Sequence, residues 1–140
     1  MLPIRHLTIH CAATPEGRNV SASAIRNIGV ERFGQASYHW VVELDGTAHR
    51  LLNDDQRGAH VGGQNTGNIG ICYIGGMDKA MKKAKDTRTP QQRATLLRLV
   101  NEYRAKYPGI TVRGHRDWPN VKKDCPSFDT RAWLLSENIK

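Results

Sequence analysis

The sequence lacks several features that would each define a class of protein. No apolar run approaches the roughly 20 residues that a membrane-spanning helix needs, and residues 1–6 lack the apolar core of a secretory signal. It also contains no internal repeat, no low-complexity segment and no linker rich in Pro, Gly or Ser. We therefore expect a single domain over residues 1–140 that is made in a cytoplasm, stays monomeric and does not insert into a membrane.

Cysteine is scarce and odd in number, with three residues in the chain. Without an export signal, this number argues against a disulfide framework. Cys11 and Cys72 lie in runs typical of buried strands, where free cysteine usually acts as a small core residue. Cys125 lies instead between Asp124 and Pro126 in a polar, turn-like segment. A thiol there has no packing reason to exist, so Cys125 is a candidate for chemistry.

Acidic residues are outnumbered, 13 against 21 basic ones, which gives a net charge of +8 and favours an anionic partner. Aromatic residues make up only 6% of the chain, and no helix-turn-helix, zinc-finger or ribonucleoprotein pattern is present. The densest basic stretch, residues 79–85, is typical of a solvated loop. We therefore expect no nucleic-acid partner, although charge alone keeps a nucleic-acid-binding domain as an alternative.

Hydrophobic periodicity predicts short strands that alternate with helices. The strands are expected at residues 7–11, 38–44, 48–52, 67–74 and 110–114, and the helices at 22–33, at about 90–107 and after Asp129. Strands and helices in this alternation predict an α/β or α+β fold in which helices flank a central mixed β-sheet.

Two local signals are strong. Asp45-Gly46 separates two strand patterns and predicts a type I′ hairpin, in which both turn residues need positive φ. Thr89, Pro90 and Gln92 form a helix start with an N-cap, a proline in the first helical position and a capping box. Pro108-Gly109 is expected to end that helix, and Asp129 to cap the last one.

Two histidines and one cysteine carry metal-ligand chemistry. Alternation along residues 7–11 points His10 away from the apolar face, and the predicted strand 110–114 delivers His115 at its end. Two imidazoles and a thiolate from Cys125 are zinc ligands, and three protein ligands with one open position are typical of a catalytic zinc. Spacing alone does not join these residues, because they are far apart in the chain.

A set of short motifs appears in the order found in one known family. These motifs are LTIHCAAT (7–14), YHWVV (38–42), DGT (45–47), GAH (58–60) with Asn65, NIGIC (68–72), GHRDW (114–118) and CPSFD (125–129). From Leu7 to about Trp133, the chain resembles N-acetylmuramoyl-L-alanine amidases of the phage T7 lysozyme type, a family that includes peptidoglycan recognition proteins. The resemblance implies one Zn²⁺ per chain, bound by His10, His115 and Cys125.

The resemblance also implies roles for four further residues. Tyr38 and Lys123 match the catalytic positions of the family, although the neighbouring Lys122 leaves the lysine assignment open by one residue. His60 and Asn65 match a substrate-binding region. The other three histidines, His6, His39 and His49, are interpreted as surface or packing residues.

The implied function is hydrolysis of the amide bond between N-acetylmuramic acid and L-alanine in peptidoglycan. A small protein without a signal or wall-binding module resembles a phage or prophage endolysin, which reaches the cell wall after a separate protein permeabilises the membrane. The alternative is a non-catalytic peptidoglycan-binding protein of the same fold. Such proteins usually lack the cysteine ligand, and Cys125 is present here.

Overall fold

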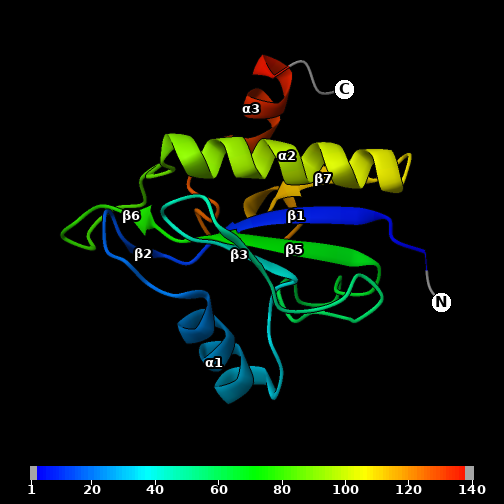
Figure 1. Cartoon of the computed structure of the whole chain (residues 1–140), viewed down its shortest axis with the longest axis horizontal. Helices are drawn as coiled ribbons and strands as arrows, with labels where there is room; N and C mark the ends of the chain where they lie inside the picture. The colour runs from blue at the N-terminus through cyan, green and yellow to red at the C-terminus, as the bar shows by residue number, and fades with distance from the viewer. Residues whose placement is uncertain (1–2, 138–140) are drawn as a thin grey trace.

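The computed structural model describes residues 3–137, and its main feature is a five-stranded sheet in the order β4-β3-β5-β1-β7 (Figure 1). Its strands are β1 (His6–Cys11), β3 (Trp40–Val42), β4 (Ala48–Arg50), β5 (Asn68–Tyr73) and β7 (Thr111–Gly114). β4 runs antiparallel to β3, whereas all other neighbours are parallel. The sheet is therefore mixed, as predicted.

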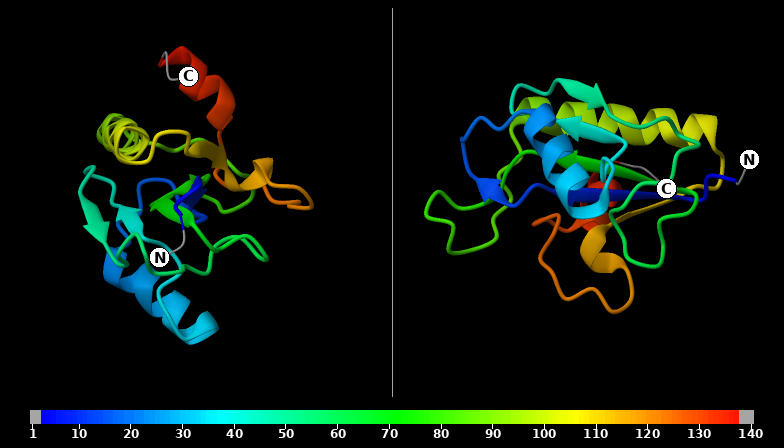
Figure 2. Two further views of the ribbon diagram at one scale, coloured as in Figure 1. Left: turned by 90° about the vertical axis from the view of Figure 1, so that its right-hand side faces the viewer. Right: turned by 90° about the horizontal axis from the view of Figure 1, so that it is seen from below.

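Helices cover both faces of this sheet. α2 (Pro90–Lys106) and α3 (Thr130–Ser136) lie on one side and α1 (Ala22–Phe33) lies on the other (Figures 1 and 2). Each side has its own apolar core: the larger joins the sheet to α2 and α3, and the smaller joins it to α1. The layered α+β architecture expected from the sequence is confirmed.

The two faces of β1 have different neighbours. Leu7, Ile9 and Cys11 pack in the core under α2. Because side chains alternate along a strand, His10 points to the opposite face, on the side of α1. His10 and residues of α1 line the same cleft, which confirms the predicted orientation of His10.

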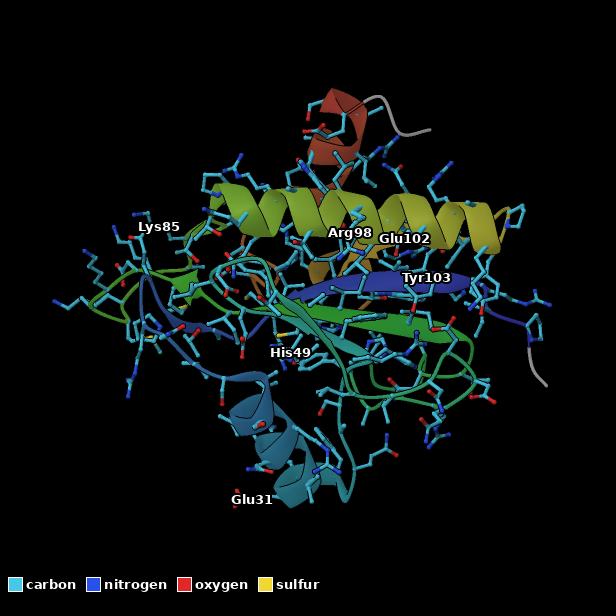
Figure 3. All side chains as sticks on the ribbon, viewed as in Figure 1. Glu31, His49, Lys85, Arg98, Glu102 and Tyr103 are labelled. Atoms are coloured by element: carbon cyan, nitrogen blue, oxygen red, sulfur yellow. The ribbon has the colours of Figure 1, made fainter. Side chains whose placement is uncertain are left out.

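α2 begins as predicted. The Thr89 hydroxyl accepts a hydrogen bond from the Gln92 backbone N–H at 3.0 Å, and the Gln92 side chain accepts one from the Thr89 N–H at 2.9 Å. Gln92 also has a role that the sequence did not reveal, because its fully buried amide donates to the carbonyl of Ile74 at 2.9 Å. Figure 3 shows Tyr103 beneath α2 beside the sheet, where it belongs to the larger core.

α1 contains a glycine in its interior for a steric reason. A Cβ at Gly29 would lie 2.8 Å from the backbone nitrogen and the hydroxyl of Ser37. The cost of glycine in a helix, roughly 1 kcal/mol relative to alanine, therefore allows the helix to pack closely against the segment that leads to Tyr38. Gly34 ends the helix in a left-handed conformation with φ of 76°.

The predicted type I′ hairpin is wrong. Gly46 has a φ of 88°, but Asp45 does not have positive φ. Glu43 accepts from the Gly46 N–H and donates to the Thr47 carbonyl, both at 2.9 Å. These bonds define a three-residue loop that ends in a left-handed glycine. The Asp45 side chain favours it by accepting a hydrogen bond from the Thr47 N–H at 2.9 Å.

Three short elements complete the chain. β2 (Thr14–Pro15) and β6 (Gly76–Met77) form a small parallel pair, which the sequence did not predict because two residues show no periodicity. η1 (His115–Asp117) follows β7 directly. At the start of α3, the Asp129 side chain accepts from the Ala132 N–H at 3.0 Å, as expected for its cap.

Candidate metal centre and cleft

His10, His115 and Cys125 meet at one edge of the sheet. His10 is the penultimate residue of β1, and His115 immediately follows β7, which runs parallel to β1 with Ile9 opposite Gly114. Because parallel strands end at the same edge, the two imidazoles become neighbours, with 4.6 Å between ring centroids.

Cys125 is held beside them by the backbone. Its Sγ accepts a hydrogen bond from the Cys11 N–H at 3.2 Å, and its carbonyl accepts one from the Arg116 N–H at 2.8 Å. The first bond ties the loop that follows η1 to the end of β1, and the second ties it back to η1. The predicted ligand residues are therefore brought together from three separate parts of the chain.

The three side chains are close enough together to hold one metal ion. One ligand atom from each of His10, His115 and Cys125 lies within 4.8 Å of the others, and Cys125 Sγ is 3.8 Å from His10 Nδ1. Ligand atoms around tetrahedral zinc with two nitrogens and a sulfur are separated by roughly 3.3–3.8 Å. The donor set is the one that zinc prefers, and three protein ligands leave one position for water or substrate.

The protonation of these side chains follows from their surroundings. Burial lowers the pKa of His10, and the charges of His60, His115 and Lys123 lower it further. Burial and the charge of Lys123 also lower the pKa of His115. Both imidazoles are therefore neutral at neutral pH, as metal ligands must be. The neighbouring Cys11 thiol and burial raise the pKa of Cys125, outweighing the Cys11 N–H bond that lowers it, so this thiol keeps its proton until a cation displaces it.

The other two cysteines behave as predicted. Cys72 is fully buried in the smaller core, and Cys11 is 7% exposed in the larger one. All three cysteines are free thiols, as expected for a chain without a disulfide framework.

A cleft of about 630 Å³ opens over the ligand cluster, and both proposed catalytic residues line it. The Tyr38 ring lies 5.0 Å from the His10 ring, between centroids. Burial raises the pKa of Tyr38, so its hydroxyl stays protonated and can donate a hydrogen bond. Lys123 lines the cleft whereas Lys122 does not, and Lys123 forms no ion pair with residues 3–137.

His60 does not offer a free polar group to the cleft. Its Nδ1 lies 2.9 Å from His10 Nε2, and its Nε2 lies 2.9 Å from the carbonyl oxygen of Asn68. The side chain is buried, and burial lowers its pKa to about 3. His60 lines the cleft, but its ring nitrogens contact His10 and Asn68, and the substrate-binding role expected for it stays a prediction.

Asn65 lines the cleft and also fixes the conformation of a loop beside it. Its side-chain oxygen accepts hydrogen bonds from the backbone N–H groups of His60 and Val61, both at 2.8 Å. The amide oxygen thus fixes the loop between residues 58 and 65. The amide nitrogen is the part of this side chain that remains for a ligand.

The remaining histidines match their interpretation as packing or surface residues. His39 is fully buried, and its Nδ1 accepts from the Gly70 N–H at 3.0 Å. His49 is partly exposed and contacts Glu43 at 2.9 Å. His6 packs edge-on against Trp118, with 5.0 Å between ring centroids.

The sequence did not reveal that α1 forms one wall of the cleft. Ile28 and Phe33 lie on this wall and are 50% and 53% exposed. Arg32 from α1 and Arg57 from the loop before His60 also line the cleft, and together with Lys123 they are its only arginine and lysine residues within 3–137. Within the described part of the chain, no carboxylate lines it. The cleft is therefore cationic, with an apolar wall.

Comparisons with a family model and with individual relatives point to the same family. Residues 1–128 match the family described as N-acetylmuramoyl-L-alanine amidase. The chain is 34% identical over 132 residues to the endolysin of Enterobacteria phage K11, a match that covers 94% of this chain and 85% of the relative. It is also 34% identical over 126 residues to the endolysin of Escherichia phage T7, covering 89% and 82%.

Solved structures agree. The amidase LysC from Clostridium intestinale superposes with a TM-score of 0.78 at 25% identity, covering 99% of this chain and 87% of the other. The Drosophila peptidoglycan recognition protein SD has a TM-score of 0.75 at 18% identity, covering 96% and 81%, and so shows the shared fold.

Proposed function

We propose that this chain, which belongs to the N-acetylmuramoyl-L-alanine amidase family, is a zinc-dependent hydrolase of peptidoglycan. The bond cut is the amide between the lactyl group of N-acetylmuramic acid and L-alanine of the stem peptide. The observation that carries the zinc dependence is the convergence of His10, His115 and Cys125 on the floor of the cleft. A non-catalytic wall-binding protein would not need this complete set of ligands.

The three ligands define what the site requires. His10 and His115 present neutral imidazoles, because their pKa values are lowered, and Cys125 supplies the single negative charge. Zinc held there supplies a Lewis acid and lowers the pKa of a water toward about 7. The apolar and hydrogen-bonded surroundings of the ligands keep them in position before any substrate arrives.

Tyr38 and Lys123 act on the substrate. The protonated Tyr38 hydroxyl lies beside His10 and donates a hydrogen bond to the scissile carbonyl or relays a proton at that point. The Lys123 ammonium stabilises the negative charge that develops on the carbonyl oxygen as the amide is attacked. Both residues contact the reacting group and do not hold the metal.

The rest of the cleft fits a stem peptide. Peptidoglycan stem peptides carry carboxylates, and the charged lining residues of the cleft at neutral pH are Arg32, Arg57 and Lys123. The apolar wall from α1 packs against aliphatic parts of the peptide, and the Asn65 amide nitrogen is available to a backbone carbonyl. This complementarity supports peptidoglycan, rather than nucleic acid, as the anionic partner of the basic chain.

We further propose that the chain acts as a monomeric phage or prophage endolysin and reaches the wall after the membrane has been permeabilised. Its similarity to phage endolysins supports this setting. In the part of the chain that the structure describes, no helix is both long and apolar enough to cross a bilayer.

Digestion of purified peptidoglycan tests the reaction. We expect new free amino groups on L-alanine with no matching rise in reducing sugar ends, because an amide and not a glycosidic bond is cut. Cys125→Ala serves as the inactive control. A rise in reducing ends would identify a glycosidase and overturn the proposal.

A further inference from the structure

We propose that His60 is a positioning residue that fixes the His10 ring so that its Nδ1 faces the metal site. This inference rests on the proposed zinc centre. It concerns a predicted substrate-binding residue that is buried and contacts the predicted ligand His10 through its ring.

The hydrogen bonds determine which nitrogen of each ring carries a proton. The Asn68 carbonyl can only accept, so His60 Nε2, 2.9 Å away, carries the hydrogen. A neutral imidazole has a single N–H, which makes His60 Nδ1 an acceptor. His10 Nε2, 2.9 Å from that atom, must then be the donor.

The consequence for His10 is direct. With its proton on Nε2, the lone pair of the neutral ring is on Nδ1, and Nδ1 is the atom that lies 3.8 Å from Cys125 Sγ. The Asn68 carbonyl of β5 thus sets the tautomer of His10 on β1, and the His60 imidazole between them transmits the effect. Partners of this kind orient metal-bound histidines in many proteins, most often as a carboxylate or a carbonyl.

The His60 ring has little freedom to leave this position. A Cβ at Gly70 would lie 2.9 Å from three of its ring atoms, and one at Gly58 would lie 2.8 Å from its Cδ2. Two glycines therefore make the slot that holds the ring. At the backbone, the Asn65 side chain accepts the His60 N–H at 2.8 Å.

His39 provides a matched control. It is a second buried histidine, with its ring centroid 6.0 Å from that of His60. Its Nδ1 accepts from the Gly70 N–H, and its Nε2 lies 2.7 Å from the Gln56 carbonyl. Both histidines bind the backbone, but only His60 contacts a predicted ligand.

The first measurement is zinc affinity, by competition with a chelator of known affinity on the full chain. His60→Phe keeps a ring of similar shape but no acceptor, and we expect zinc binding to weaken by about 10–100-fold. His60→Gln retains an oxygen that can accept from His10 and should restore part of this loss. His39→Phe should lower the melting temperature and leave zinc affinity within about threefold, since it contacts no ligand. Equal affinities for folded His60→Phe and wild type would overturn the proposal.

The second measurement needs neither metal nor activity. In ¹⁵N NMR spectra of the metal-free wild-type chain, His10 should show the proton on Nε2, and His60→Gln should keep that tautomer. A proton on His10 Nδ1 in the wild type would disprove the positioning role, even if His60→Phe fails to fold. If the wild type instead shows the expected tautomer but binds no zinc, the positioning role stands and the proposed zinc dependence fails.

Discussion

The rings of His10 and His115 lie 4.6 Å apart because β1 and β7 run parallel and end at the same edge of the sheet. His10 belongs to β1, the first strand along the chain, and His115 follows β7, the last strand along the chain. Register, and not sequence spacing, therefore builds the candidate metal site, and the loop that carries Cys125 closes it through a hydrogen bond from Cys11. The family resemblance groups these three residues, and the topology explains how residues so far apart in the chain come together.

Metal binding should release protons. The pKa of Cys125 is raised by the neighbouring Cys11 thiol and by burial, while the pKa values of His10 and His115 are lowered. At neutral pH the histidines are already deprotonated, so zinc has to displace about one proton, from the thiol. Affinity should rise with pH, and calorimetry in buffers of different ionisation enthalpy measures the proton count.

The proposed metal centre predicts the zinc content of the protein. Gently purified protein should contain about one zinc per chain, Cys125→Ala far less, and chelation should abolish activity. Cys72→Ala is the matched control, because Cys72 is a buried thiol of the core and does not belong to the ligand cluster. Full activity in a zinc-free preparation would refute the mechanism.

Lys123 should be separable from metal binding. Lys123→Ala should keep its zinc and its fold while kcat falls by about 10²–10³, the usual loss when one oxyanion donor is removed. Lys122→Ala removes the same charge one residue away. Because Lys122 does not line the cleft, this variant should lose little of its kcat. Steady-state kinetics on soluble muropeptides compares them. Equal losses would mean general attraction to the wall, and Lys123 would then have no catalytic role.

Arg32 and Arg57, the arginines of the cleft, should strengthen substrate binding. Arg32→Gln and Arg57→Gln should each raise KM for muropeptides with free carboxylates by up to about fivefold, since exposed ion pairs contribute about 0.2–1 kcal/mol. The effect should shrink at high salt and on substrates whose carboxylates are amidated. Arg26→Gln changes an exposed arginine of α1 that does not line the cleft. If all three variants respond alike, the cleft arginines do not recognise the peptide.

Local signals explain which parts of the fold could be predicted. The start of α2 is encoded in Thr89, Pro90 and Gln92, and the structure has the complete capping box. The Asp45-Gly46 pair, in contrast, is compatible with more than one hairpin loop. The choice follows from Asp45 binding the Thr47 N–H and from the close approach of Gln91 to Gly46, and a contact with α2 is not visible in a local pattern.

Some residues of the candidate site could likewise be predicted from the sequence and others could not. Family resemblance identified His10, His115 and Cys125, which the structure brings together. The contact between His60 and His10 could not be predicted, because it depends on the pairing of β1 with β5 and on the space left by Gly58 and Gly70. Charged residues on a helix surface are usually solvated, so nothing in the sequence marked Arg32 as part of a cleft wall.

Asp54 should control stability without affecting the site. Its carboxylate is 9% exposed and accepts hydrogen bonds from Arg50 and from three residues of or next to α2, namely Tyr103, Lys106 and Tyr107. Burial by itself raises the pKa of Asp54, but the hydrogen bonds from α2 outweigh it and lower the pKa to about 2. The carboxylate thereby anchors the loop after β4 to the helix.

The sign of the pH effect follows from this lowered pKa. In the unfolded chain an aspartate titrates near about 3.9, so the stability that Asp54 contributes is complete above that pH and is lost as the pH falls toward 2. Asp54→Asn should lower the free energy of unfolding by about 1–3 kcal/mol at pH 7, and the difference from wild type should shrink between pH 4 and 3. Urea denaturation of the metal-free proteins measures both values, with the exposed neighbour Asp55→Asn as control. Zinc content should not change, because Asp54 contacts none of the ligands. A difference that stays constant from pH 7 to pH 3 would show that the loss is steric rather than electrostatic.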